Sequence, residues 1–162
     1  TLSKLPQLTT SEMTKVLARK RGYVETLFGR KRFLPEITSG VPQVRAAAER
    51  MAVNMPIQGT QADLLKMAMI RVDEWIRGGN FSTSSEGERE GGGRSLENRI
   101  RMVLQVHDEL VFEVREKFVE DATRALTDIL EHVHQLSVPI VVEAKVGPSW
   151  GTMKPVDVEA AT

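Results

Sequence analysis

The sequence predicts an α+β fold in which helices pack against an antiparallel β-hairpin and sheet. Two apolar runs at 100–106 and 109–114 meet at a short polar turn, which is the pattern of a β-hairpin. Residues 117–134 follow with apolar side chains at helical spacing, and 138–146 is a valine-rich segment typical of a strand. The order hairpin, helix, strand therefore indicates a layer of antiparallel strands with helices on one face.

The N-terminal part predicts a helix and a second, shorter hairpin. Ser11 begins a helical pattern that should end near Gly22, because glycine readily terminates a helix. Residues 23–27 and 32–34 are short β-rich runs on either side of a turn at Gly29. We expect these two runs to pair.

Two helical segments are predicted next, separated at Pro56. The first is the alanine-rich stretch 41–53, and the second repeats apolar residues at helical spacing from Leu64 to Ile76. Proline has no N–H to donate and restricts the residue before it. We therefore expect the helix to kink or restart at Pro56.

The segment 78–98 differs in composition from the rest of the chain. It reads GGNFSTSSEGEREGGGRSLEN, so glycine and serine dominate and almost no apolar residue is available for packing. We predict a disordered surface insertion, with a functional arm as the alternative.

Composition excludes several classes of protein. The 162 residues are 41% hydrophobic, enough for one domain with a core, and the absence of cysteine excludes disulfides and thiolate metal sites. The apolar runs are too short for a membrane span or a signal peptide, so we expect a cytoplasmic protein without a membrane partner. The first residue is threonine, from which we expect a truncated chain.

Formal net charge is zero, but the charges are unevenly distributed. Residues 15–32 hold seven basic residues, Arg30 among them, against one acid. Such a strip can face phosphate groups. Residues 108–131 hold eight acids against three basic residues, and part of this run is interpreted as a solvated helix face.

The turn between the two predicted strands contains His107, Asp108 and Glu109. Tight hairpin turns favour glycine and asparagine because their central residues need positive φ. An imidazole and two acids in that place suggest a tip that binds a hard cation or meets a phosphate group. The alternative is a solvated polar hairpin end.

Three polar residues recur every four positions in the middle of the chain. Arg50, Asn54 and Gln58 would form one stripe about 12 Å long on a continuous helix. A guanidinium and two amides can reach phosphate oxygens and base edges. A solvated helix face is the alternative, and a kink at Pro56 would turn Gln58 away from the others.

Three blocks together resemble the C-terminal part of a family A DNA polymerase, the bacterial DNA polymerase I type. They are GYVETLFGRKRFLP at 22–35, AAAERMAVNMPIQGTQADLLKMAM at 46–69 and LQVHDELVFEV at 104–114. The similarity covers most of residues 13–151. It implies a partial polymerase palm with helices that connect palm and fingers, and residues 1–162 as an incomplete polymerase domain.

The resemblance implies roles for the turn residues. Asp108 corresponds to a palm carboxylate that binds catalytic Mg²⁺, Glu109 is the neighbouring acid, and His107 and Gln105 correspond to positions near the primer terminus. The stripe residues would lie along the cleft for primer-template DNA. The complete enzyme is then expected to be a monomer that uses deoxynucleoside triphosphates to extend a primer by two-metal phosphoryl transfer in replication and repair.

Two departures from the family pattern qualify these implications. Gln61 stands where the family usually has alanine, and no DYSQIELR-like segment or fingers helix is found. The second catalytic aspartate is therefore missing, and we expect this chain alone to be inactive. The alternatives are a non-catalytic nucleic-acid-binding remnant and an unrelated α+β interaction domain.

Overall fold

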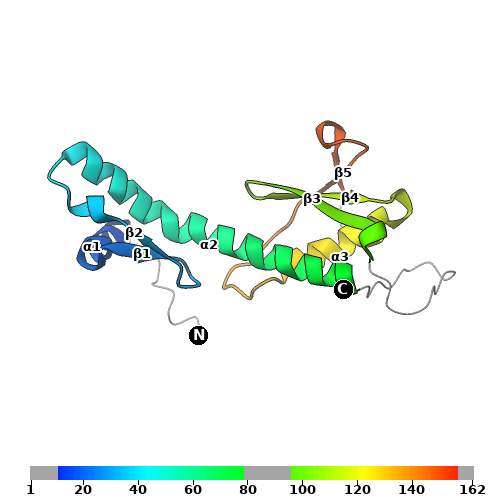
Figure 1. Ribbon diagram of the computed structural model, residues 1–162, viewed down its shortest axis with the longest axis horizontal. Coiled ribbons are helices and arrows are strands. Elements are labelled where there is room, and N and C mark those ends of the chain that lie inside the picture. The colour runs from blue at the N-terminus through cyan, green and yellow to red at the C-terminus, as the bar shows by residue number, and fades with distance from the viewer. Residues whose placement is uncertain (1–10, 79–95, 157–162) are drawn as a thin grey trace. The chain divides into compact units, whose positions relative to one another are not determined.

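The computed structural model describes residues 11–78 and 96–156, and the chain divides into two compact units between Leu64 and Leu65 (Figure 1). The principal elements are α1 (Ser11–Arg21), β1 (Tyr23–Glu25), β2 (Lys31–Phe33), α2 (Pro42–Gly78), β3 (Ile100–Val106), β4 (Glu109–Val114), α3 (Val119–Glu131), β5 (Ala144–Val146) and β6 (Lys154–Val156). The predicted mixture of helices and antiparallel strands is confirmed. Within the described residues, however, the strands form three separate two-stranded ribbons instead of one sheet.

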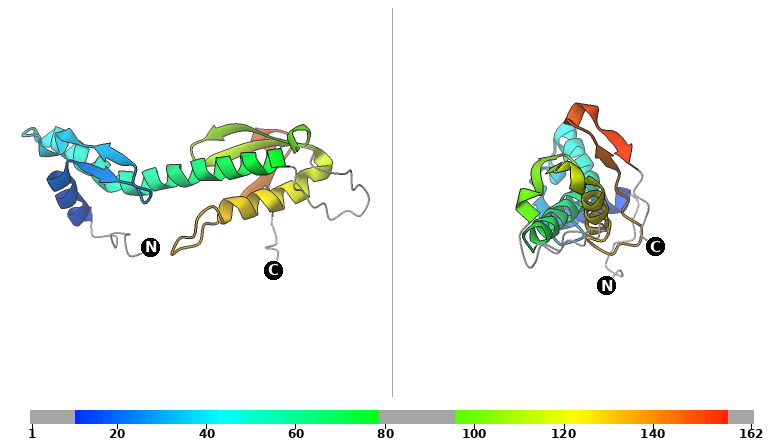
Figure 2. Two further views of the ribbon diagram at one scale, coloured as in Figure 1. Left: turned by 60° about the horizontal axis from the view of Figure 1, so that its bottom comes forward. Right: turned by 90° about the vertical axis from the view of Figure 1, so that its right-hand side faces the viewer.

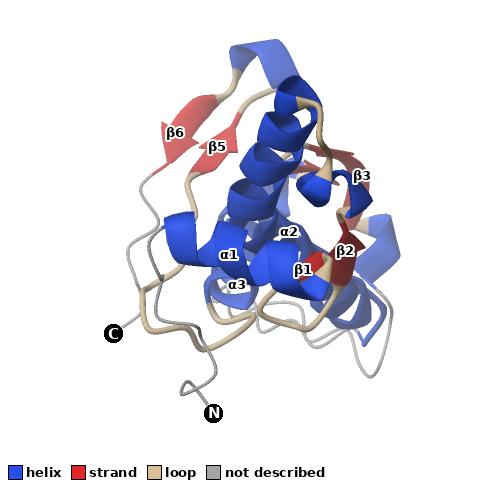
Figure 3. Ribbon diagram, turned by 90° about the vertical axis from the view of Figure 1, so that its left-hand side faces the viewer, coloured by secondary structure: helices blue, strands red, loops and turns tan. Residues whose placement is uncertain are grey.

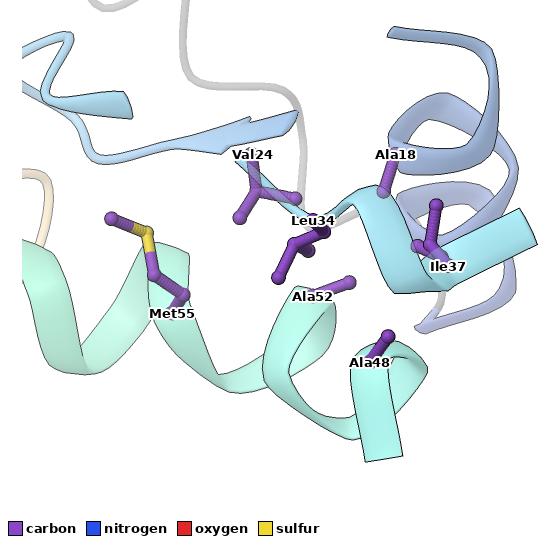
Figure 4. Close-up of a cluster of buried hydrophobic side chains, with 7 residues drawn as sticks. All are labelled: Ala18, Val24, Leu34, Ile37, Ala48, Ala52 and Met55. Carbon is purple, nitrogen blue, oxygen red and sulfur yellow. The ribbon is translucent and has the colours of Figure 1, made fainter. Parts of the chain in front are cut away.

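The core of the first unit combines alanines with larger apolar side chains (Figure 4). Its buried core joins α1, the β1–β2 hairpin, a 3₁₀ turn (Pro35–Thr38) and the first half of α2. The core residues are Ala18, Val24, Leu34, Ile37, Ala48, Ala52 and Met55. Alanines on both helices allow the backbones to approach closely, so the hairpin is held against α2.

The β1–β2 hairpin follows the sequence prediction. Tyr23 pairs with Phe33 and Glu25 with Lys31. Gly22 has φ +75° directly after α1, and its N–H donates to the carbonyl of Ala18 (2.8 Å), a helix end that favours glycine. The short strands are thus fixed by a helix stop on one side and by a turn on the other.

α2 continues through Pro56, so the predicted restart of the helix at this residue is wrong. Proline removes one helical hydrogen bond, but the residues around it remain in register because Ala52 and Met55 are buried in the core of the first unit. The Thr60 hydroxyl also donates to the Pro56 carbonyl (2.5 Å). The burial of Ala52 and Met55 on one face of α2 therefore outweighs the loss of one backbone hydrogen bond at Pro56.

The second unit has its own core. Val72, Ile76 and Leu96 meet Ile100 of β3 and the inner face of α3, where Ala122 and Leu126 are buried. Figure 2 shows α3 beside the C-terminal half of α2, with the β3–β4 hairpin over them. Phe118, Ile129 and Val133 also lie on the predicted inner face, although α3 ends at Glu131, three residues earlier than predicted.

The β3–β4 hairpin has the predicted bounds and one irregularity. Met102 pairs with Phe112, whereas Leu104 pairs with Val111, so Val103 is an extra residue in β3. Such a β-bulge bends its strand and increases the local twist. Each of the two strands has one partner within the part of the chain that the structure describes.

The predicted strand at 138–146 is reduced to three residues. Only Ala144–Val146 is extended in a ladder, and it pairs with β6, which the sequence did not predict (Figure 3). Pro139 cannot donate, and the Val142 N–H donates to the Glu131 carboxylate (3.0 Å) instead of a strand. The earlier part of the segment is therefore bound to the end of α3.

The bounds of the predicted insertion need correction at both ends. Gly78 is the last residue of α2, and Leu96–Asn98 is a 3₁₀ turn in which Leu96 is only 2% exposed. Leu96 is part of the second core, so it contradicts the expectation that the whole of 78–98 is a disordered surface insertion. Residues 79–95 lie outside the described residues.

Candidate nucleic-acid interface and metal-binding turn

The tip of the β3–β4 hairpin is a two-residue turn made of His107 and Asp108. Val106 pairs with Glu109 on either side of it. His107 has φ +52°, the one positive φ of a non-glycine residue in the described chain, as the tight turn requires at its first central position. The Gln105 amide donates to the His107 carbonyl (2.7 Å) and closes the turn.

The two acids of this turn are exposed and offer oxygen ligands. Mg²⁺ prefers carboxylate oxygens and keeps several waters, so Asp108 fits such an ion as one ligand group. Glu109 begins β4, where neighbouring side chains point to opposite faces, which makes it a weaker candidate. Within residues 11–78 and 96–156 no group of three or more His, Cys, Asp or Glu could hold a metal ion. The two acids thus offer carboxylate oxygens, and with the other described residues they do not make a complete metal site.

The first unit contains a groove of about 720 Å³ between the β1–β2 hairpin and α2. Its polar lining combines four cations and two amides: Arg30, Lys31, Arg32, Arg50, Asn54 and Gln58. The remaining lining residues are Ala47, Met51, Met55 and Gly59. Because no acid belongs to this lining, the groove suits a polyanion.

The three stripe residues lie together because α2 is continuous. Arg50, Asn54 and Gln58 are all exposed and all line the groove, so the predicted stripe is formed. The Arg50 side chain makes no ion pair or hydrogen bond to another part of the described chain. Its charge is therefore available to a ligand.

The opposite wall comes from β2. Lys31 Nζ lies 4.7 Å from the centre of the Tyr23 ring, and an Arg32 terminal nitrogen lies 3.3 Å from the Met51 sulfur. These contacts orient both side chains without neutralising them. Two basic residues thus face the groove with their charge intact.

Arg30 is different from its two neighbours. Its Nε donates to the Asp63 carboxylate (2.7 Å) and its Nη2 to the Gly59 carbonyl (2.9 Å). Arg30 was expected to contact phosphate, but part of its charge is already balanced by an acid on α2. The partners Gly59 and Asp63 were not predicted, because they lie about thirty residues away and no local pattern marks such a pairing.

The predicted site residues therefore form two groups. Arg30, Arg50, Asn54 and Gln58 meet at the groove of the first unit, and Gln105, His107, Asp108 and Glu109 meet at the hairpin tip of the second unit. Each group lies within a single unit.

Comparison with known proteins identifies the family. The model of DNA polymerase family A matches residues 8–152. This chain belongs to DNA polymerase family A. The match includes both the groove and the hairpin tip, and it agrees with the similarity expected over residues 13–151.

Relatives of this family A chain include bacterial DNA polymerase I proteins. That of Pseudomonas aeruginosa is 43% identical over 139 residues, which are 86% of this chain and 13% of the relative. The thermostable DNA polymerase I of Thermus aquaticus is 43% identical over 143 residues, which are 88% of this chain and 15% of the relative. The chain thus spans about one seventh of the length of these relatives.

A solved family A structure has the same fold. It is the POL domain of Pol1 from M. smegmatis in complex with DNA primer-template and dNTP, with a TM-score of 0.66 and 40% sequence identity. The similarity covers 80% of this chain and 20% of that chain. The mixed helical and antiparallel fold of this family A chain is therefore that of a partial polymerase domain. None of its described helices is long and apolar enough to cross a membrane.

Proposed function

We propose that this family A chain is the C-terminal, incomplete part of the polymerase domain of a DNA-directed DNA polymerase. The complete enzyme adds deoxynucleotides to a primer 3′ end in DNA replication and repair. The observation that carries this proposal is the acid-free groove in which Arg50 faces Lys31 and Arg32. The positive charge of its lining suits the backbone of a nucleic acid.

The groove residues have separate parts in this reaction. Arg50, Lys31 and Arg32 are proposed to contact phosphates, which fixes the position of primer-template DNA but carries no sequence information. Asn54 and Gln58 can donate to the acceptors that recur on base edges of the minor groove. The chain would therefore hold DNA by shape and charge, as a template-directed enzyme requires.

The hairpin tip is proposed to take part in the chemistry. Asp108 would hold Mg²⁺, with Glu109 as a second and weaker carboxylate, and His107 and Gln105 would lie near the primer terminus. When bound, a pair of divalent ions activates the primer 3′ oxygen and stabilises the charge of the triphosphate. A further carboxylate is needed for that pair, because the described residues supply only two acids at this turn.

The partners follow from the same proposal. They are primer-template DNA and deoxynucleoside triphosphates, which are also the ligands of the M. smegmatis structure. We propose a complete enzyme that is monomeric and acts in the cytoplasm, and the absence of cysteine is compatible with that reducing compartment.

The decisive test is Asp108→Ala in a complete polymerase that contains this segment. Primer extension should fall by orders of magnitude, while the Kd for primer-template changes only a few-fold. Glu113→Ala is the matched control, because Glu113 is an exposed acid on β4, the strand that follows Asp108, and pairs with Arg101 away from the tip. Near-normal turnover of the Asp108 variant would remove the metal-ligand assignment.

A nucleic-acid-binding polypeptide without catalysis is the second candidate. It is favoured by the fact that the basic groove is formed entirely within the first unit and needs none of the hairpin acids. In that case Asp108→Ala would change neither primer extension nor the Kd for primer-template, whereas Arg50→Ala would still weaken DNA binding.

A further inference from the structure

The turn between β1 and β2 is attached to α2 by several independent contacts. Besides the two bonds of Arg30, the Leu27 N–H donates to the Thr60 hydroxyl (2.9 Å). That hydroxyl in turn donates to the Pro56 carbonyl, which fixes its orientation. Both ends of the turn are therefore bound to one face of one helix.

Inside the turn, Thr26 completes the arrangement. It is a buried polar residue with 4% exposure, and its hydroxyl accepts from the Arg30 N–H (3.1 Å). A Cβ at Gly59 would lie 2.7 Å from Thr26 Cγ2 and 3.3 Å from Arg30 Nη2. The close approach of the turn to α2 thus requires glycine at this position.

We propose that Gly59, Thr60 and Asp63 form a clamp that positions the β1–β2 turn, and that Arg30 is a positioning residue within it and not a phosphate contact. The clamp keeps Lys31 and Arg32, the next residues after the turn, on the wall opposite Arg50. This inference rests on the proposed DNA-binding function and assigns to Asp63 a role in the shape of the groove.

Because Asp63 is negatively charged, the direction in which its replacement changes the Kd for DNA tests the inference. Asp63 is an acid beside a groove proposed to bind a polyanion, so its removal should strengthen DNA binding if charge alone mattered. If Asp63 holds Arg30 in place, its removal should weaken binding because the basic wall moves. The two explanations predict opposite changes of Kd.

The experiment measures fluorescence anisotropy of a labelled primer-template with the 162-residue chain across a salt series. Asp63→Asn should raise the Kd roughly two- to thirty-fold, the range found for changes within a coupled network. Arg30→Ala should give the same Kd and the same salt slope as Asp63→Asn, because both variants release the same basic wall. Gly59→Ala alters no charge and should also raise the Kd, as should Thr60→Val, whereas Thr60→Ser keeps the hydroxyl and should behave as the wild type.

Arg50→Ala separates failure of this inference from failure of the proposed function. If Arg50→Ala weakens binding but Asp63→Asn leaves it equal or tighter, the clamp has no role and the function stands. A salt slope smaller for Arg30→Ala than for Asp63→Asn would instead make Arg30 a phosphate contact and overturn its positioning role. If neither Arg50→Ala nor Asp63→Asn alters binding, the proposed groove is not the DNA site.

A second readout tests the clamp without DNA. Amide hydrogen exchange at Leu27 and Arg30 reports the bonds that these two N–H groups make. Asp63→Asn and Thr60→Val should accelerate exchange at these positions while circular dichroism shows an unchanged helix content. Unchanged protection in both variants would overturn the clamp.

Discussion

Arg50 carries the charge that is most available in the groove. It is exposed, and no described residue pairs with it, in contrast to Arg30. Arg50→Ala should therefore weaken primer-template binding and lower the salt slope by about 0.9, the value for one phosphate contact on duplex DNA. Binding titrations over a salt series measure both quantities.

The control for that variant is Lys66→Ala. Lys66 is an exposed cation on the same helix and does not line the groove. It should leave the slope unchanged, so equal effects of the two variants would return Arg50 to the role of a solvated surface residue.

Glu49 connects α1 to α2 and gives the first unit a dependence on pH. A hydrogen bond from Arg19 holds the pKa of Glu49 below its ordinary value of 4.5. A lowered pKa stabilises the fold where the carboxylate is charged, above pH 4.5, and this contribution is lost as pH falls through the folded-state pKa. Glu49→Gln should therefore lower Tm at pH 7 and have little effect at a pH below the folded-state pKa of Glu49.

Thermal unfolding followed by circular dichroism at the two pH values tests this expectation. Glu36→Gln is the matched control, because the exposed Glu36 side chain makes no hydrogen bond or ion pair with a described residue. An equal loss of Tm at both pH values would show that Glu49 acts through packing and not through its charge.

At the scale of elements, the segment between α2 and β3 should tolerate shortening. Residues 79–95 hold a single apolar residue, Phe81, and so offer little surface to offset the entropy of ordering. A short Gly-Ser linker in their place should change Tm by only a few degrees, provided that Leu96–Asn98 is kept.

Leu96→Ala in the shortened chain is the contrasting variant. Leu96 is fully packed in the second core, so its truncation should cost about 2–5 kcal/mol of unfolding free energy. A large loss from the linker alone would mean that residues 79–95 contribute contacts of their own.

Local sequence patterns predicted the elements whose structure depends on residues close together in the chain. The β3–β4 hairpin was predicted to the residue because two apolar runs enclose a polar turn. The stripe from Arg50 to Gln58 follows from helical spacing only when α2 is continuous. The continuity of α2 through Pro56 was not predictable, because it depends on burial of Ala52 and Met55 against a hairpin distant in sequence. The bond between Arg30 and Asp63 was missed for the same reason.

At the scale of the whole molecule, this chain alone should not extend a primer. The described residues hold two acids at the hairpin tip and no group of three or more metal-binding side chains, whereas two-metal phosphoryl transfer needs a further carboxylate. We expect weak, salt-sensitive binding of primer-template and no Mg²⁺-dependent extension, measured by incorporation of labelled deoxynucleotides.

A parallel preparation of Asp108→Ala controls for host polymerase. Activity found equally in both preparations belongs to the contaminant. Extension by the wild type that the variant lacks would show that the two described acids suffice, with Glu109 as the second ligand.

The extra residue Val103 changes the phase of side-chain alternation within β3. Met102 and Leu104 are two positions apart, yet they face opposite sides of the hairpin because their partners, Phe112 and Val111, are neighbours. Beyond the bulge, Gln105 therefore lies on the same face of the hairpin as Phe112, which packs against the second core. Leu104 lies on the opposite face and is 45% exposed. The extra residue Val103 thus determines on which face of the hairpin Leu104 and Gln105 lie, next to the tip.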